Sequence, residues 1–487
     1  MREGLGDRIE ELSKKYCNPL AGIYSITKKK LTDNLQEKSL HIIIFILLTC
    51  IALLGRILIA YYYRENFGTD AIYFWDNQVD FNPNFVYFEG YKDFHNYYVN
   101  WAYAWYVKDW YPFQDWRGIN RLDPLDMYSY PALFLYILVI FWRPGMPKFW
   151  LGFPLMLTDA LCAGMVYLIL KEIIKKRGGI YIAIFGGVLM AISPINLIYT
   201  GVYWLNTGPV TLFVLVCFYF LTQRKWWQTF FWLAIATMCK QDGLFLIYPI
   251  FLMMLGEKVR DKGIKRGILE SSCNGVVFLF TCVICSIPWI FITPILYGIH
   301  MLYPGKMLSL EHDIGDISQV YSFSWALYYH NIRGVFLDIV AFGVNSMLFM
   351  IVFATIIAIY MMWRAFYKKM DNIELFEFSA IYIILTHIFL PRGIFKFYTP
   401  FYMPFIIIAI VTSLTQFNKR NIALLITLPL TALIIIGFGI WHQVAVGFFI
   451  PILLFYMSLL LLALAISRKG FNRIMKKNQK NKLIHSV

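Results

Sequence analysis

Long apolar runs separated by short polar segments constrain the fold of this chain more than any other feature. A helix that crosses a bilayer needs about 20 mostly apolar residues. Twelve runs approach or exceed that length: 41–62, 149–170, 179–198, 208–222, 226–239, 243–256, 274–298, 336–363, 373–390, 398–416, 421–440 and 444–466. We therefore predict an all-α polytopic membrane protein with about 12 transmembrane helices and a single membrane domain over residues 41–466.

The composition agrees with this interpretation. Hydrophobic residues make up 59% of the chain and charged residues 15%, whereas soluble domains carry about 25% charged residues. These values exclude a soluble enzyme, a disordered chain and a nucleic-acid-binding domain. The eight cysteines are scattered, and the Cys282-x-x-Cys285 pair falls inside an apolar run, so we expect neither a disulfide framework nor a metal site.

The distribution of basic residues predicts the orientation. The net charge is +15. If the N-terminus is cytoplasmic and residues 128–142 do not cross, cytoplasmic segments hold 31 Lys and Arg residues and external segments hold 12. The inverse arrangement places the Lys258–Arg266 cluster outside, against the positive-inside rule. Segments 1–40 and 467–487 are therefore predicted to be cytoplasmic, and the excess positive charge is assigned to membrane lipid rather than nucleic acid. Residues 128–142 either lie on the outer surface or re-enter.

The longest predicted external loop, 63–148, is rich in acidic and aromatic residues. No Gly or Pro interrupts the segment from Asp93 to Trp110. Its aromatic residues recur at helical spacing: Phe94, Tyr97, Tyr98, Trp101 and Trp105. This pattern predicts a helix at the membrane interface, where Trp and Tyr are favoured. A second long external loop is predicted at 299–334.

Two oppositely charged residues fall within the first two predicted spans. Arg56 lies in the first run and Asp159 in the second. Charges at such depth are costly and are usually paired. We expect the two side chains to pair with each other across the helices.

Several short motifs occur in a characteristic order. They are Tyr91-Lys-Asp93-Phe-His-Asn-Tyr-Tyr, Trp110-Tyr-Pro-Phe, Tyr128-Ser-Tyr130-Pro131-Ala-Leu, Leu157-Thr-Asp159-Ala-Leu, Ser193-Pro194 leading into Tyr203-Trp204-Leu-Asn206, Lys240-Gln241, and Arg392-Gly-Ile-Phe-Lys396-Phe-Tyr-Thr-Pro400. This order resembles that of GT-C glycosyltransferases, in particular transferases that take mannose or glucose from dolichyl phosphate. The chain departs from the family pattern at Ala132, where the family has a second proline, and at Leu205-Asn206, where it has a Gln-Asp-like pair.

The resemblance implies roles for individual residues. The family places its catalytic acid at the position of Asp93, which would act as general base toward an acceptor hydroxyl, with Asp70 and Asp76 as alternatives. Cations near the outer surface are expected to bind the donor phosphate and stabilise it as a leaving group. The substrate-binding residues implied are Lys240, Gln241, Arg392, Lys396, Trp204, Asn206 and Tyr130. No cofactor or metal is implied.

The predicted function is the transfer of one hexose, with inversion, from a polyprenyl or dolichyl phosphate to a lipid-linked glycan or another acceptor on the external or lumenal face. The membrane would be the plasma membrane of a prokaryote or the endoplasmic reticulum of a eukaryote. One alternative is a transporter or flippase of lipid-linked glycans, although such proteins often show internal repeats. The other alternative is a polymerase or ligase of surface polysaccharide.

Overall fold

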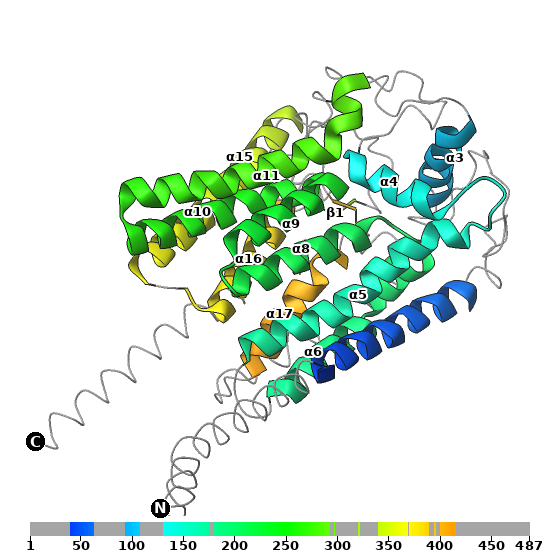
Figure 1. The fold of residues 1–487 in the computed structure, drawn as a ribbon, viewed down its shortest axis with the longest axis horizontal. Helices are drawn as coiled ribbons and strands as arrows, with labels where there is room; N and C mark the ends of the chain where they lie inside the picture. The colour runs from blue at the N-terminus through cyan, green and yellow to red at the C-terminus, as the bar shows by residue number, and fades with distance from the viewer. Residues whose placement is uncertain are drawn as a thin grey trace, which may run out of the picture.

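The computed structural model describes residues 39–62, 93–107, 130–174, 179–292, 297, 320–321, 339–368, 370–388, 394–395 and 400–414. These residues form a bundle of apolar helices, with shorter helices gathered at one end (Figure 1). The remaining residues, including the predicted spans 421–440 and 444–466, lie outside the described part of the chain.

The helices follow the predicted apolar runs closely. In chain order the first half contains the helix Ser39–Tyr62, the π-helix η2 (Asp93–Tyr98), α3 (Val99–Val107), α4 (Ala132–Phe141), α5 (Phe149–Ile173), α6 (Gly179–Ala191), α7 (Pro194–Asn196), the π-helix η4 (Leu197–Val202) and α8 (Thr207–Thr222). The second half contains α9 (Trp226–Cys239), the 3₁₀-helix η5 (Gln241–Gly243), α10 (Leu244–Lys262), α11 (Ile264–Ile292), β1 (Val320–Tyr321), α15 (Ile339–Tyr367), α16 (Asn372–Ile388), β2 (Ile394–Phe395) and α17 (Met403–Leu414).

Four helical segments within the described residues are both long and apolar enough to cross a membrane: Ser39–Tyr62, Phe149–Ile173, Ile264–Ile292 and Met350–Tyr367. The all-α class of a membrane protein is thus compatible with the structure. α4 has 10 residues and is therefore about 15 Å long, half the thickness of a hydrocarbon core. This length agrees with the prediction that residues 128–142 do not cross.

The prediction of one continuous helix over 179–198 is wrong. α6 ends at Ala191, and the chain restarts as α7 and then as the π-helix η4. Pro194 has no N–H for the helical hydrogen-bond ladder, which explains why the regular helix stops just before it. The break turns a single predicted helix into a bent segment.

The segment between the predicted spans 243–256 and 274–298, which carries the Lys258–Arg266 cluster, is helical on both sides of one residue. α10 continues to Lys262 and α11 begins at Ile264. Gly263 between them has φ +78°, and a Cβ atom there would meet nothing within 4 Å. The left-handed backbone, which glycine adopts readily, makes the sharp reversal between the two helices.

Polar contacts join several predicted cytoplasmic segments at one end of the bundle. Arg224 Nε lies 3.0 Å from Glu257 Oε1 at the end of α10. The Nη2 of Arg224 donates to the carbonyl oxygen of Met370, and Arg260 Nη1 donates to that of Ala365, each at 2.6 Å. The segments between α8 and α9, α10 and α11, and α15 and α16 therefore meet at the same end, as the charge distribution predicts.

Two predicted external loops also meet. β1 pairs antiparallel with β2, with Val320 opposite Phe395 and Tyr321 opposite Ile394. β1 belongs to the loop 299–334, and β2 lies in the Arg392–Pro400 motif, in the external loop between the predicted spans 373–390 and 398–416. Their pairing requires both loops to be on the same side of the bundle, in agreement with the predicted topology.

Candidate functional site

An aromatic cluster occupies the predicted external end of the bundle. We use this name for Phe94, Tyr98, Trp101, Tyr130, Phe134 and Trp204. Phe94, Tyr98 and Trp101 on η2 and α3 are buried, and the Tyr98 ring packs edge-to-face on Phe134 of α4 with 5.0 Å between centroids. The helix predicted from Asp93 is thus confirmed over 93–107. Its aromatic face, which was predicted to lie at the membrane interface, packs into a protein core. Figure 1 shows α3 and α4 together at this end.

Trp204 has an unusual backbone conformation at the centre of this cluster. Its φ is +55°, a region that bulky side chains rarely adopt. The indole is fully buried and packs edge-to-face against Phe94, with 4.9 Å between ring centroids. It also lies so close to Gly152 of α5 that a Cβ added there would sit 2.2 Å from Trp204 Cδ2. The backbone conformation is therefore held by tight packing from two helices.

The packing of Trp204 connects distant motifs. Phe94 directly follows Asp93, the predicted general base, so the Asp93-containing turn and the 203–206 turn are adjacent in space. Tyr130 stacks edge-to-face on Trp101 at 5.8 Å and thereby brings the third motif to the same place. The side chain of Asp93, and the residues Asp70, Asp76, Arg392 and Lys396, lie outside what the structure describes.

Lys240 has a counterion that the sequence reasoning missed. Its Nζ lies 2.7 Å from Asp242 Oδ2, and the two side chains are 0% and 5% exposed. Gln241 between them is buried as well. Lys240 is therefore half of a buried ion pair at the break between α9 and η5, rather than an exposed cation. An acid two residues after a lysine inside an apolar stretch is the signal that was available in the sequence.

Asn206 is the remaining predicted substrate residue. It is buried and precedes the first turn of α8. Its Nδ2 has no hydrogen-bond partner among the described residues. Buried amide donors are rarely left unsatisfied, so this group is a candidate for a ligand or a water contact.

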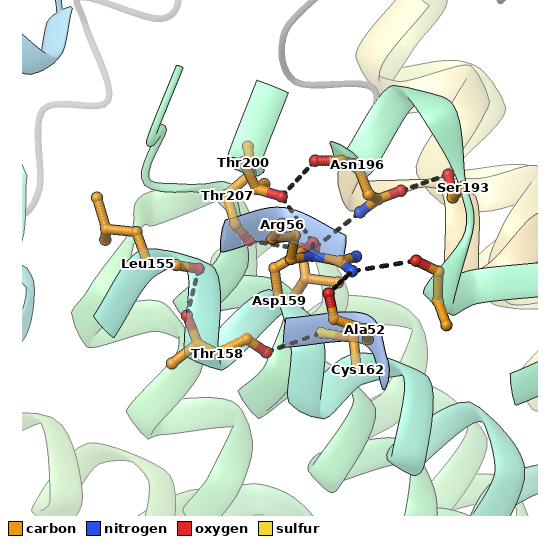
Figure 2. A network of polar contacts seen from close by, with 12 residues as sticks. Ala52, Arg56, Leu155, Thr158, Asp159, Cys162, Ser193, Asn196, Thr200 and Thr207 are labelled. Carbon is orange, nitrogen blue, oxygen red and sulfur yellow. Dashed lines mark hydrogen bonds and ion pairs between the residues drawn. The ribbon is translucent and has the colours of Figure 1, made fainter. Parts of the chain in front are cut away.

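A buried polar network lies deeper in the bundle, centred on Asp159 of α5 (Figure 2). Arg56 Nε donates to Asp159 Oδ2 at 2.5 Å, and both side chains are essentially inaccessible to solvent. Arg56 Nη1 also donates to the carbonyl oxygens of Ala52 and Ala191, at 2.9 and 3.1 Å. The predicted pairing of Arg56 with Asp159 is confirmed.

The bent segment after α6 supplies the other partners of Asp159. Asn196 Nδ2 donates to Asp159 Oδ1 at 2.7 Å. Thr200 Oγ1 lies 2.6 Å from Asp159 Oδ2 and 2.5 Å from the carbonyl oxygen of Asn196. Ser193 Oγ donates to Asn196 Oδ1 at 2.8 Å. The carboxylate thus links the helix Ser39–Tyr62, α5 and the segment that leads to Trp204.

The sequence prediction of this network did not include Asn196 and Thr200. Their i, i+4 spacing at the end of the run 179–198 places them on one helical face, which was the available signal. The charges compensate each other and the remaining carboxylate lone pairs are hydrogen-bonded, so the network is suited to holding helices in register. Within the described residues, no group of three or more His, Cys, Asp or Glu side chains is arranged to hold a metal ion.

The fold therefore defines a helical protein with several helices that suit a membrane, and with motif-bearing turns clustered at one end. No protein-family model matches the chain, and no curated protein matches it in sequence.

Proposed function

We propose that this protein is an integral membrane hexosyltransferase of the GT-C type, with about twelve spans and both termini cytoplasmic. The donor is a polyprenyl or dolichyl phosphate carrying mannose or glucose. The acceptor is a lipid-linked glycan or another hydroxyl-bearing molecule at the external or lumenal face.

In the proposed reaction an acceptor hydroxyl oxygen attacks the anomeric carbon of the sugar. Asp93 takes the proton of that hydroxyl as the new glycosidic bond forms. The bond between the anomeric carbon and the phosphate oxygen breaks, and its electron pair remains on the polyprenyl phosphate. A single displacement of this kind inverts the configuration at the anomeric carbon.

One observation carries the proposal: the described parts of two first-loop motifs (93–98 and 130–133), the 203–206 turn and the Lys240 turn gather at the same end of the bundle. Phe94 contacts Trp204, and Met238, two residues before Lys240, belongs to the same buried core as both rings. These segments are far apart in sequence, and a membrane-surface transferase needs them together.

The cations of the proposed donor site include Lys240, Arg392 and Lys396. Lys240 shares its charge with Asp242, so the donor phosphate would compete with this carboxylate for the ammonium group. Charge-assisted contacts to phosphate are short and strong, which makes the exchange feasible when the donor also brings its own hydrophobic chain.

The test is an assay of membranes from cells that produce the chain, with a panel of radiolabelled polyprenyl-phosphate hexoses. Asp93→Asn should lower transfer at least about 100-fold, since the amide cannot act as a base. Asn96→Gln, at a neighbouring position of η2, serves as the matched control and should retain activity. Transfer that is unchanged in Asp93→Asn would contradict the assignment of the base, and no transfer from any donor would contradict the proposed activity.

The topology has its own test. Cys50 and Cys273 are exposed among the described residues, and Cys17 lies outside them. In a chain in which all three are replaced by serine, one cysteine introduced at Asn120 or at Lys265 reports the side of that segment. A membrane-impermeant maleimide should label Asn120→Cys from outside intact cells and Lys265→Cys only after permeabilisation. Labelling of both positions from the same side would contradict the proposed orientation.

A further inference from the structure

The reversal between α10 and α11 gathers positive charge on the surface. We use the name basic turn for Lys258, Arg260, Lys262, Lys265 and Arg266. Residues 258–270 hold these five cations but only two carboxylates, Asp261 and Glu270. Gly263 brings the cations of both helices to one place.

Glu270 compensates only part of this charge. Its carboxylate accepts from Lys258 Nζ at 2.8 Å and from Lys262 Nζ at 2.5 Å, while Arg266 Nε lies 3.5 Å away. The side chain of Arg266 is 74% exposed. Lys265 is also exposed and forms no ion pair with the described residues. A positive excess therefore faces solvent at this turn.

Exposed apolar side chains accompany these cations. Ile264, Ile268 and Leu269, in the first turns of α11, are each at least half exposed. On α15, Trp363 and Tyr367 are exposed as well. α15 reaches the same level as the basic turn, because Arg260 Nη1 donates to the carbonyl oxygen of Ala365. Trp and Tyr with such exposure are typical of the level of lipid headgroups.

We infer that the basic turn is a binding site for the headgroup of an anionic phospholipid, with the acyl chains lying along Ile264, Ile268 and Leu269. The site is distinct from the proposed transferase site and does not depend on that activity. It is at the opposite end of the bundle from the aromatic cluster.

The chemistry of the turn fits this ligand in three respects. The phosphate meets several Lys and Arg side chains, which attract anionic lipid near a surface. The N-terminus of the 29-residue helix α11 adds backbone N–H groups and the positive end of a helix dipole. The adjoining isoleucine and leucine side chains suit acyl chains, whereas a soluble polyanion would gain nothing from them.

The experiment measures the unfolding temperature of the full-length protein in a neutral detergent. Dihexanoyl phosphatidylglycerol, dihexanoyl phosphatidylcholine and inorganic phosphate are titrated separately. Phosphatidylglycerol should raise the unfolding temperature saturably, and the other two should have little effect. The variant K262Q/K265Q/R266Q should raise its half-saturation concentration at least about 20-fold, because each surface cation contributes a factor of about five and Lys262 is partly neutralised by Glu270.

Two further variants control for folding. The charge-conserving K262R/K265R/R266K should bind phosphatidylglycerol within about twofold of the original chain. Glu270→Gln removes the carboxylate that competes with the lipid phosphate, so it should tighten phosphatidylglycerol binding about fivefold. This variant tests the inference if the triple glutamine variant does not fold. Equal stabilisation by phosphatidylcholine, an effect of inorganic phosphate equal to that of the lipid, or unchanged binding in Glu270→Gln and in the glutamine variant would each overturn the inference.

Discussion

The ion pair between Arg56 and Asp159 offers the sharpest test of the packing. Replacing Asp159 with leucine leaves a fully buried guanidinium without its carboxylate, and replacing Arg56 with methionine leaves a buried carboxylate without its cation. Removal of one partner of a buried ion pair typically costs about 3–5 kcal/mol. Each single variant should therefore be strongly destabilised.

The double variant R56M/D159L should be more stable than either single variant. It buries no unpaired charge, and apolar replacements of buried pairs are often neutral. One residual cost remains, because Asn196 Nδ2 loses its acceptor. Leaving this buried donor unsatisfied costs about 1–3 kcal/mol. Thr200 keeps the carbonyl oxygen of Asn196 as a partner, so its hydroxyl adds little to the loss.

The assay is the free energy or midpoint of unfolding of the purified proteins in detergent, by denaturant titration with intrinsic fluorescence and circular dichroism. Thr211→Val is the matched control, because Thr211 is buried but its hydroxyl bonds only the carbonyl oxygen of Thr207 in its own helix. It should lose no more than about 1 kcal/mol. If the double variant were as unstable as the sum of the two single variants, the pair would not be coupled and the reasoning would be refuted.

Two further predictions concern the predicted external end. Lys240→Met should lose about 3–5 kcal/mol of stability, because it removes the described counterion of Asp242. The double variant K240M/D242L should recover most of this loss in the same unfolding assay. Equal losses in both variants would speak against the ion pair. Gly152→Ala should cost about 1–3 kcal/mol, because the new methyl overlaps the indole of Trp204, whereas Gly275→Ala, with its nearest atom at 3.6 Å, should be tolerated; a fully stable Gly152→Ala would contradict the packing around Trp204.

The sequence predicts the helices well where one periodic apolar run is bounded by clear breakers. The run 226–239 coincides with α9. Apolar content alone does not locate the end of a helix, however: α10 continues past its apolar run to Lys262, and α11 begins at Ile264, ten residues before the run 274–298. The stop after Ala191 was signalled by Pro194, yet the π-helical continuation depends on tertiary contacts such as that between Thr200 and Asp159.

The site is less predictable than the fold for a physical reason. Motif order suggested a family resemblance but no contact between particular residues, and the packing of Phe94 on Trp204 is seen only in the structure. Ion-pair partners depend on side-chain geometry. The pairing of Arg56 with Asp159 followed from the cost of an isolated buried charge. The same cost applies to Lys240, whose partner Asp242 is only two residues further along the chain. The tight fit of Gly152 against Trp204 has no sequence signal, because it depends on how α5 approaches the 203–206 turn.

The Arg56–Asp159 pair also has a consequence for biosynthesis. The two residues are separated by 103 positions, and chains are elongated at about 5–20 residues per second. Arg56 therefore leaves the ribosome roughly 5–20 s before its partner exists, and Asn196 arrives later still. During that interval the first helix carries an uncompensated guanidinium six residues from its end at Tyr62, whose insertion costs less than the value of about 2.5–3.5 kcal/mol at a helix centre. The helix should consequently remain beside the insertion machinery, or sit displaced toward the interface, until α5 emerges and the two helices can be released into the bilayer together.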